Sequence, residues 1–164
     1  MTQQRKNGIQ RIVSGGQTGV DRGALDAAIY LGLPHGGWCP RGRIAEDGLI
    51  PHKYELTETT AREYWVRTEQ NVIDSDGTLI LYRDQLRGGT QFTRRMAKKH
   101  RKPLYLLDLT AVHDFADVRH WIAREQIATL NCAGPRESSA PGIEAQACQV
   151  LTHILTPDGK EFDR

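Results

Sequence analysis

Short apolar runs alternate with segments of helical period along this chain, and this alternation constrains the fold more than any other feature. Strands are predicted at 11–13, 37–39, 78–82, 104–108 and 128–132. Helices are predicted over 21–31, from residue 60 onward, over 89–100, around 115–122 and over 143–154. The run 78–82 is continuously apolar, which is typical of a strand buried on both faces. The sequence therefore predicts an α/β fold, with a doubly wound, mainly parallel sheet and helices on both faces.

The 164 residues contain no internal repeat, low-complexity tract or linker, so we expect a single domain over 1–164 with its core at about 11–155. The polar first ten residues resemble no signal peptide, and no apolar run approaches the roughly 20 residues of a membrane span. Three cysteines without a CxxC pair are typical of a reducing compartment. We therefore expect a cytoplasmic protein with no membrane partner.

Glycine makes up 16 of the 164 residues, and six of these glycines lie in three predicted strand-to-helix turns. We call these the first loop (14–21, SGGQTGVD), the second loop (83–90, RDQLRGGT) and the third loop (131–138, NCAGPRES). Turns that follow parallel strands meet at one edge of the sheet, where ligands bind. Glycine lets backbone amides approach a ligand, and helix N-termini favour anions. The three loops therefore predict an anion-binding site, although tight turns needed for packing would have the same composition.

The candidate ligand-binding residues are Gly15, Gly16, Gln17, Thr18, Gly19, Asp21, Gly88, Gly89, Thr90, Gly134, Arg136, Glu137 and Ser138. Arg41 and Arg43 follow the strand predicted at 37–39 and are expected to cover the ligand, unless they are solvated surface arginines. The first loop is neither a Walker A motif nor a GxGxxG motif, which disfavours P-loop and dinucleotide-binding proteins.

No metal site and no nucleic-acid binding are expected. The six histidines are scattered without ligand spacing, and Cys39 is expected to be a small buried thiol. Residues 83–102 carry a net charge of +7, which leaves −5 for the rest of the chain. Only Phe92 lies near these charges, whereas single-stranded nucleic acids need aromatic stacking. A solvated helix face or a subunit contact is the favoured interpretation of this basic stretch.

Four sequence blocks resemble the molybdenum-cofactor carrier family: SGGQTGVDRGALDAA, GWCPRGRIAEDG, NVIDSDGTLIL together with GGT, and NCAGPRES. This family belongs to a Rossmann-like superfamily that includes lysine-decarboxylase-like cytokinin phosphoribohydrolases. The resemblance runs from about 11 to 154 and implies a Rossmann-like domain, homo-oligomerisation, often as a tetramer, and binding of molybdenum cofactor, a phosphorylated molybdopterin. A molybdenum enzyme or a cofactor-biosynthesis protein would be its partner.

One departure from the related phosphoribohydrolases bears on catalysis. Their PGGxGTxxE pattern ends in a glutamate that assists cleavage of an N-glycosidic bond, and Thr93 stands at the corresponding position here. A hydroxyl cannot replace a carboxylate as general acid or base near neutral pH. We therefore predict no catalytic residue. The alternative is a nucleotide-derivative sensor or phosphoribohydrolase in which Asp21 or Glu137 substitutes, unless Asp21 serves its helix N-terminus and Glu137 is held by Arg136 or a backbone amide.

Overall fold

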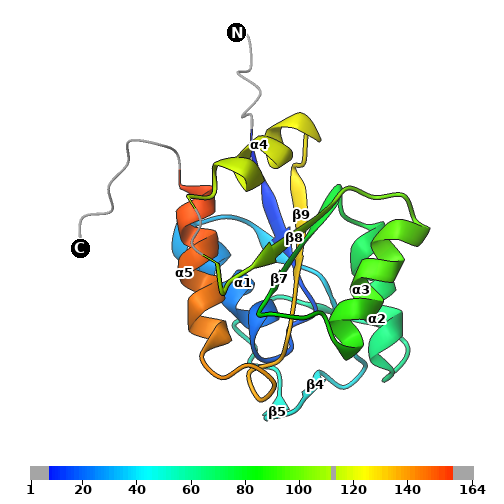
Figure 1. Ribbon diagram of the computed structural model, residues 1–164. Coiled ribbons are helices and arrows are strands. Elements are labelled where there is room, and N and C mark those ends of the chain that lie inside the picture. Colours follow the sequence, from blue (N-terminus) through cyan, green and yellow to red (C-terminus); the bar gives the residue numbers. More distant parts are fainter. Residues whose placement is uncertain (1–7, 112–113, 157–164) are drawn as a thin grey trace, which may run out of the picture.

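Five parallel strands form the central sheet of the computed structural model, which describes residues 8–111 and 114–156. Their order across the sheet is β2-β1-β9-β7-β8. The strands are β1 (Arg11–Val13), β2 (His35–Gly36), β7 (Gly77–Tyr82), β8 (Leu104–Asp108) and β9 (Thr129–Ala133). Because all of them are parallel, their carboxyl ends share one edge (Figure 1).

Helices cover both faces of this sheet, as the alternation of apolar runs and helical segments predicts. Figure 1 shows α1 (Val20–Leu31) and α5 (Ile143–Leu155) on one side and α2 (Tyr64–Ile73) and α3 (Gly88–Lys99) on the other. The remaining helix of the described residues, α4 (Ala116–Arg124), packs against α5. None of the helices in 8–111 and 114–156 has the length and hydropathy of a membrane span. The predicted doubly wound α/β fold is confirmed.

The core is formed by the apolar strands of the sheet and by the apolar faces of the helices that cover them. Leu79, Ile80 and Leu81 of β7 have no exposed surface, which confirms that this continuously apolar strand is covered on both faces. On the α1 and α5 side, small residues such as Ala24 and Ala147 allow the two helices to approach closely. The central strands are therefore held rigidly, and the loops at their carboxyl ends start from fixed positions.

The second predicted strand differs from the structure. The strand that joins the main sheet is His35–Gly36, whereas β3 (Trp38–Cys39) pairs in parallel with β6 (Thr57–Glu58) in a separate two-stranded sheet. At Gly37 a Cβ would lie 2.2 Å from the Ser14 carbonyl oxygen, so the chain turns away from β1 at a residue that only glycine can occupy. Between β3 and β6, β4 (Ile44–Ala45) and β5 (Gly48–Leu49) form an antiparallel hairpin.

Helix α2 begins at Tyr64, four residues after the predicted start at 60. The predicted start is wrong because residues 60–63 form an irregular segment after β6, in which the Arg41 amide donates to the Ala61 carbonyl at 2.9 Å. Thr68 and Val72 of this helix are buried. Trp65, three residues before Thr68 and therefore on the same side of the helix, is 50% exposed. The late start therefore leaves the first turn of α2 outside the core.

Candidate functional site

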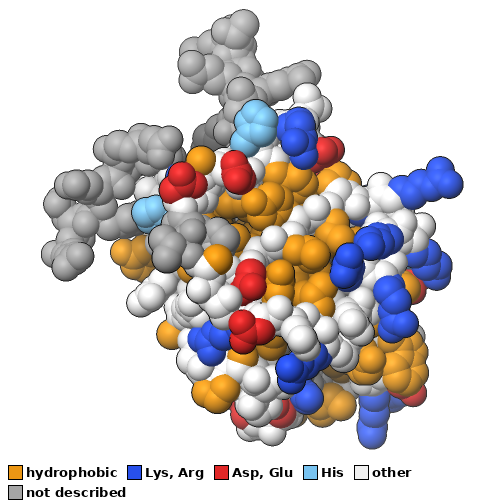
Figure 2. Space-filling model, viewed as in Figure 1, with side chains coloured by type: hydrophobic (Ala, Val, Ile, Leu, Met, Phe, Trp, Pro, Cys, Tyr) orange, Lys and Arg blue, Asp and Glu red, His pale blue; other side chains and the backbone are white. Residues whose placement is uncertain are grey.

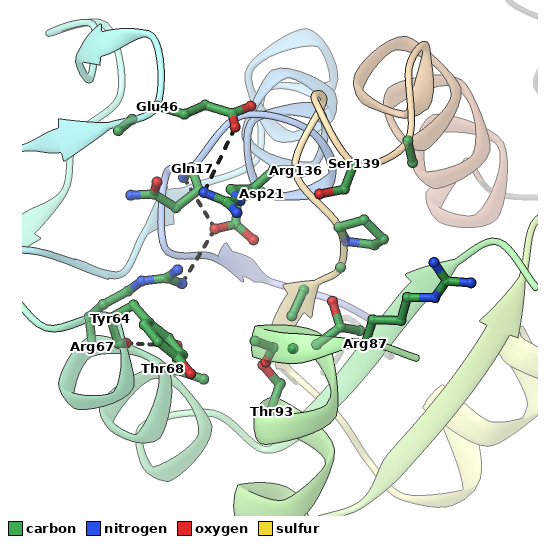
Figure 3. A pocket seen from close by; sticks show the side chains of 18 of the residues that line it. Gln17, Asp21, Glu46, Tyr64, Arg67, Thr68, Arg87, Thr93, Arg136 and Ser139 are labelled. Atoms are coloured by element: carbon green, nitrogen blue, oxygen red, sulfur yellow. Dashed lines mark hydrogen bonds and ion pairs between the residues drawn. The ribbon is translucent and has the colours of Figure 1, made fainter. Parts of the chain in front are cut away.

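A cleft of about 1200 Å³ lies at the carboxyl edge of the sheet. Parts of all three glycine-rich loops line it, together with the first turns of α2 and α3 and the β4–β5 hairpin (Figure 3). Its arginines are Arg62, Arg67, Arg83, Arg87 and Arg136. Its carboxylates are Asp21, Glu46, Glu63 and Asp84. The lining therefore carries a slight excess of positive charge, at the sheet edge where α/β proteins bind ligands.

The first loop is closed around a carboxylate of its own. Asp21 in the first turn of α1 accepts the Gln17 amide at 3.2 Å, and its side chain is only 6% exposed. The amide of Gly19 donates instead to Glu144 of α5, at 3.0 Å. Because the Gln17 and Gly19 amides already donate to carboxylates, Asp21 and Glu144 take the place that an anionic ligand of the first loop would have.

Arg67 of α2 completes this arrangement. Its Nη1 lies 3.5 Å from Asp21 Oδ2, and Figure 3 shows the side chain reaching from α2 toward the first loop. A Cβ at Gly15 would lie 2.0 Å from that guanidinium nitrogen. Burial raises the pKa of Asp21, although Arg67, the Gln17 amide and Arg22 each act to lower it. Gly15 therefore makes room for an arginine of the protein.

The other glycines of the first and third loops also pack against the protein. A Cβ at Gly16 would meet Leu56 at 2.4 Å, and one at Gly19 would meet the Pro135 carbonyl at 2.2 Å. At Gly134 the obstacle is the Leu81 carbonyl, at 2.1 Å. Packing alone thus accounts for the absence of side chains at these positions.

Glu46 of the β4–β5 hairpin joins the first loop to the third. Its carboxylate accepts hydrogen bonds from the Thr18 hydroxyl, the Ser138 hydroxyl and, at 3.2 Å, the Ser138 amide. The guanidinium of Arg136 lies 3.8 Å away. Hydrogen bonds from Ser138 and Thr18 lower the pKa of Glu46. The neighbouring Asp47 forms a forked pair with the buried Arg22, with an Nη2–Oδ1 distance of 2.8 Å, so the hairpin is fastened at two points.

The second loop is open where α3 begins. A Cβ at Gly88 would have nothing within 4 Å, and one at Gly89 would touch only the Tyr64 ring, at 3.7 Å. Thr90 lines the cleft and is 6% exposed, and its hydroxyl has no hydrogen-bond partner among the described residues. Unpaired amides at a helix N-terminus attract anions. Among the described residues, no carboxylate accepts a hydrogen bond from Gly88, Gly89 or Thr90, in contrast to the first loop.

The structure brings only some of the predicted site residues to the cleft. Those that line it are Gln17, Asp21, Gly88, Gly89, Thr90, Gly134 and Arg136. Those that do not are Gly15, Gly16, Thr18, Gly19, Arg41, Arg43, Glu137 and Ser138. Whether the first group binds a ligand stays a prediction.

Arg43 and Glu137 have structural partners instead. The Nη2 of Arg43 donates to the carbonyls of Pro51 and Tyr54, at 3.0 and 2.9 Å, and thereby holds the 50–54 segment. Glu137 accepts the amides of Gly142 and Glu144 at the start of α5. The structure therefore agrees with the alternative that backbone amides hold the Glu137 carboxylate.

Sequence reasoning missed the contribution of α2 to the cleft. The helix supplies Arg62 and Glu63 from just before its first turn, and Tyr64, Trp65, Arg67 and Thr68 from the helix itself. None of these residues follows a strand of the main sheet, so the rule for carboxyl ends does not find them. The available signal was the polar and aromatic composition of 62–67 at a helix start.

The basic stretch 83–102 lies mostly on α3, and Figure 2 shows lysine and arginine side chains gathered on that side of the molecule. Some of these charges have local partners: Lys99 Nζ lies 3.3 Å from Glu69, and Lys102 donates to the Ser75 carbonyl at 2.9 Å. Cys39 is fully buried, as expected of a packing thiol. Among the described residues, which exclude His113, no group of three or more histidine, cysteine or acidic side chains is arranged to hold a metal ion.

A parallel five-stranded sheet with glycine-rich loops around a cleft at its carboxyl edge defines a Rossmann-like protein. The chain belongs to the circularly permutated YpsA SLOG family, whose profile matches residues 12–155. It is similar to a protein of known crystal structure from Syntrophus aciditrophicus SB, named "putative molybdenum carrier protein". The two are 42% identical over 92% of this chain and 97% of the other, with a TM-score of 0.87. No curated protein matches the chain.

Proposed function

We propose that this protein carries molybdenum cofactor, a phosphorylated pterin dithiolene with molybdate oxygens, which it binds, protects from oxidation and transfers without turnover. Two facts support the proposal: the name of the relative, which is 42% identical, and the chemistry of the cleft. The observation that carries it is the open first turn of α3, which faces a cleft of about 1200 Å³. Pockets for small molecules have volumes of roughly 300–1,000 Å³, so the space suffices for one such ligand.

The first turn of α3 is the best place for the terminal phosphate. Gly88 and Gly89 are exposed and line the cleft, and the Thr90 hydroxyl adds a donor beside their amides. A phosphate here would also gain from the partial positive charge of the helix N-terminus. Each hydrogen bond to a charged group contributes about 1.5–3 kcal/mol, so this turn alone gives modest affinity.

The arginines would supply the remaining affinity for oxyanions. Arg62 and Arg87 line the cleft, and within the described residues neither guanidinium has a hydrogen-bond or ion-pair partner. Arg67 and Arg136 are held by Asp21 and Glu46. Forked contacts from Arg62 and Arg87 to phosphate or molybdate oxygens would break no existing pair.

Titration with reduced molybdopterin cofactor under anaerobic conditions tests the proposal. Gly89→Asp places a carboxylate at the proposed phosphate site, and Gly89→Asn is the matched uncharged control, since the position has room for a side chain. We expect saturable binding that Gly89→Asp weakens at least tenfold, or about 1.4 kcal/mol, and that Gly89→Asn largely preserves. Absence of saturable binding by the wild-type protein would refute the carrier function. Mass spectrometry and pterin fluorescence of ligand released from freshly purified protein would identify a bound species directly.

A second candidate is hydrolysis of a nucleotide derivative, and Asp21 is the observation that favours it. This carboxyl lines the cleft and burial raises its pKa, as in many general acids. Thr93, by contrast, donates its hydroxyl to the Gly89 carbonyl at 3.0 Å and offers no acid. Release of base from a nucleoside monophosphate that Asp21→Asn abolishes would favour the hydrolase.

We further propose that the chain is cytoplasmic and forms a homo-oligomer, with a tetramer expected. Its partner would be a molybdenum enzyme or a cofactor-biosynthesis protein.

A further inference from the structure

Two neighbouring aromatic side chains are exposed at the mouth of the cleft. Tyr64 and Trp65 form the start of α2, line the cleft, and are 44% and 50% exposed. Exposed apolar residues scattered singly need no explanation, but an adjacent pair inside a ligand cleft does. The buried residues of α2 are Thr68, Asn71 and Val72, so neither aromatic side chain belongs to the core.

The Tyr64 ring is held from two sides. It makes edge-to-face contacts with Trp65, at a centroid distance of 5.5 Å and an angle of 77°, and with Phe92 of α3, at 6.0 Å and 82°. The guanidinium of Arg95 lies 5.6 Å from the Phe92 ring centroid. Edge-to-face packing of this kind fixes the orientation of the rings, and Tyr64 and Trp65 still keep 44% and 50% of their surface exposed. We call Tyr64, Trp65 and Phe92 the aromatic ledge.

The ledge adjoins the open first turn of α3. The Tyr64 ring lies 3.7 Å from the point where a Cβ of Gly89 would stand. A ligand with an anionic group at the Gly88 and Gly89 amides would therefore have its next few atoms beside Tyr64. The sequence hides this arrangement because 27 positions separate Phe92 from Trp65, and only the packing of α2 on α3 brings them together.

We infer that Tyr64 and Trp65 form a stacking surface that selects a planar heterocycle, a pterin, in the bound ligand. The inference rests on the proposed function and adds a source of specificity to it. Arginines and helix amides recognise any phosphate, so the groups described above would not separate a pterin phosphate from inorganic phosphate. Aromatic stacking makes that distinction, and losing one stacked contact lowers affinity by about ten- to a hundredfold.

The test uses two probes that divide the ligand: neopterin, a pterin without phosphate, and inorganic phosphate. Trp65→Leu and Tyr64→Leu remove a ring each, while Trp65→Phe and Tyr64→Phe keep one. Tyr30→Leu is the matched control, since Tyr30 is 62% exposed and does not line the cleft. We expect the leucine variants to weaken neopterin binding at least tenfold and to leave phosphate binding within twofold. The phenylalanine variants and Tyr30→Leu should bind neopterin nearly as the wild type does.

Tryptophan fluorescence provides an independent readout. The chain has three tryptophans; Trp121 is buried, and the indole of Trp38 donates to Asp74 at 2.7 Å. Neopterin should quench the wild-type emission through Trp65, and most of this quenching should vanish in Trp65→Phe even though binding persists.

Three results would overturn the inference: no neopterin binding by the wild type, leucine variants that bind neopterin as the wild type does, or equal weakening of both probes, which would indicate a merely structural role. Titration with the intact cofactor separates this failure from that of the carrier function. If the wild type binds cofactor and the leucine variants bind it equally well, only the stacking surface is refuted. If the wild type does not bind cofactor, the carrier function itself fails.

Discussion

The first loop and the second loop have similar compositions and opposite roles. Both join a strand to a helix and both contain paired glycines. In the first loop, the guanidinium of Arg67 occupies the space where a side chain at Gly15 would lie. The amide of Gly19 donates a hydrogen bond to the Glu144 carboxylate. In the second loop, Gly88 faces open space at the start of α3. A glycine-rich turn can therefore close a structure or open a site, and only its contacts distinguish the two.

The largest expected effect on stability comes from replacing a glycine by alanine. The substitution is compared at a closely packed glycine, Gly134, and at an open one, Gly89. Gly134→Ala, in the third loop, would place its Cβ 2.1 Å from the Leu81 carbonyl and should lower the free energy of unfolding by about 3 kcal/mol. Gly89→Ala has room and should change it by less than about 1 kcal/mol, in either direction. Denaturant unfolding of the two variants measures the difference. Equal stabilities would show that the closed and open loops do not differ as described.

A smaller effect is expected from Arg67→Met, which removes the partner of Asp21. We expect a loss of about 2 kcal/mol at neutral pH, less than for a fully buried pair because Arg67 is 15% exposed and the Nη1–Oδ2 distance is 3.5 Å. The folded-state pKa of Asp21 is raised, so the stability that this group contributes is present below its unfolded pKa and is lost as pH rises through the folded pKa. Removing Arg67 raises that pKa further, and the destabilisation should therefore grow from acidic to neutral pH.

Unfolding of Arg67→Met at a series of pH values checks this prediction. The double variant Arg67→Met with Asp21→Asn is its control, because it has no carboxyl at 21 to titrate. The pH dependence specific to Arg67→Met should disappear in the double variant. A loss of stability that is the same at acidic and neutral pH would contradict the assignment of Asp21 as the anion that closes the first loop.

The smallest effect is expected at the hairpin. Glu46→Gln keeps the shape of the side chain but removes the charge that Thr18, Ser138 and Arg136 share. Because this carboxylate is partly solvated, the loss at neutral pH should be about 1 kcal/mol or less. The pKa of Glu46 is lowered by folding, so its contribution is present above its unfolded pKa and is lost as pH falls through the folded value.

Thermal unfolding across that pH range would measure the effect, with the exposed Glu55→Gln as the matched control. The wild type and Glu46→Gln should become equally stable under strongly acidic conditions. A difference that persists there would mean that the contacts of Glu46 do not depend on its charge.

Much of the fold was predictable because burial imposes its period on the sequence. The continuous apolar run of β7 and the helical spacing of α1 and α5 identified their elements directly. The prediction failed where local sequence preferences compete with long-range strand pairing. At 37–39 the residues favour a strand, but the strand pairs with β6 and leaves the main sheet, and this detour delays the start of α2.

The candidate site was predictable in its location and less so in its members. Following strands to their carboxyl ends located the three loops, because parallel strands share one edge. Arg67, Tyr64 and Trp65 were missed because α2 reaches the cleft through packing on α3 and not through the order of the sheet.

The sequence by itself determined the α/β architecture, the positions of the glycine-rich loops and the family, since these depend on local periodicity and on motifs read along the chain. The tertiary structure alone decided which loop is closed and which is open. Gly19 receives its partner from Glu144, 125 residues away, and Gly15 faces Arg67 from another helix. The availability of a backbone amide depends on what packs against it, and for these loops the packing groups come from distant parts of the chain.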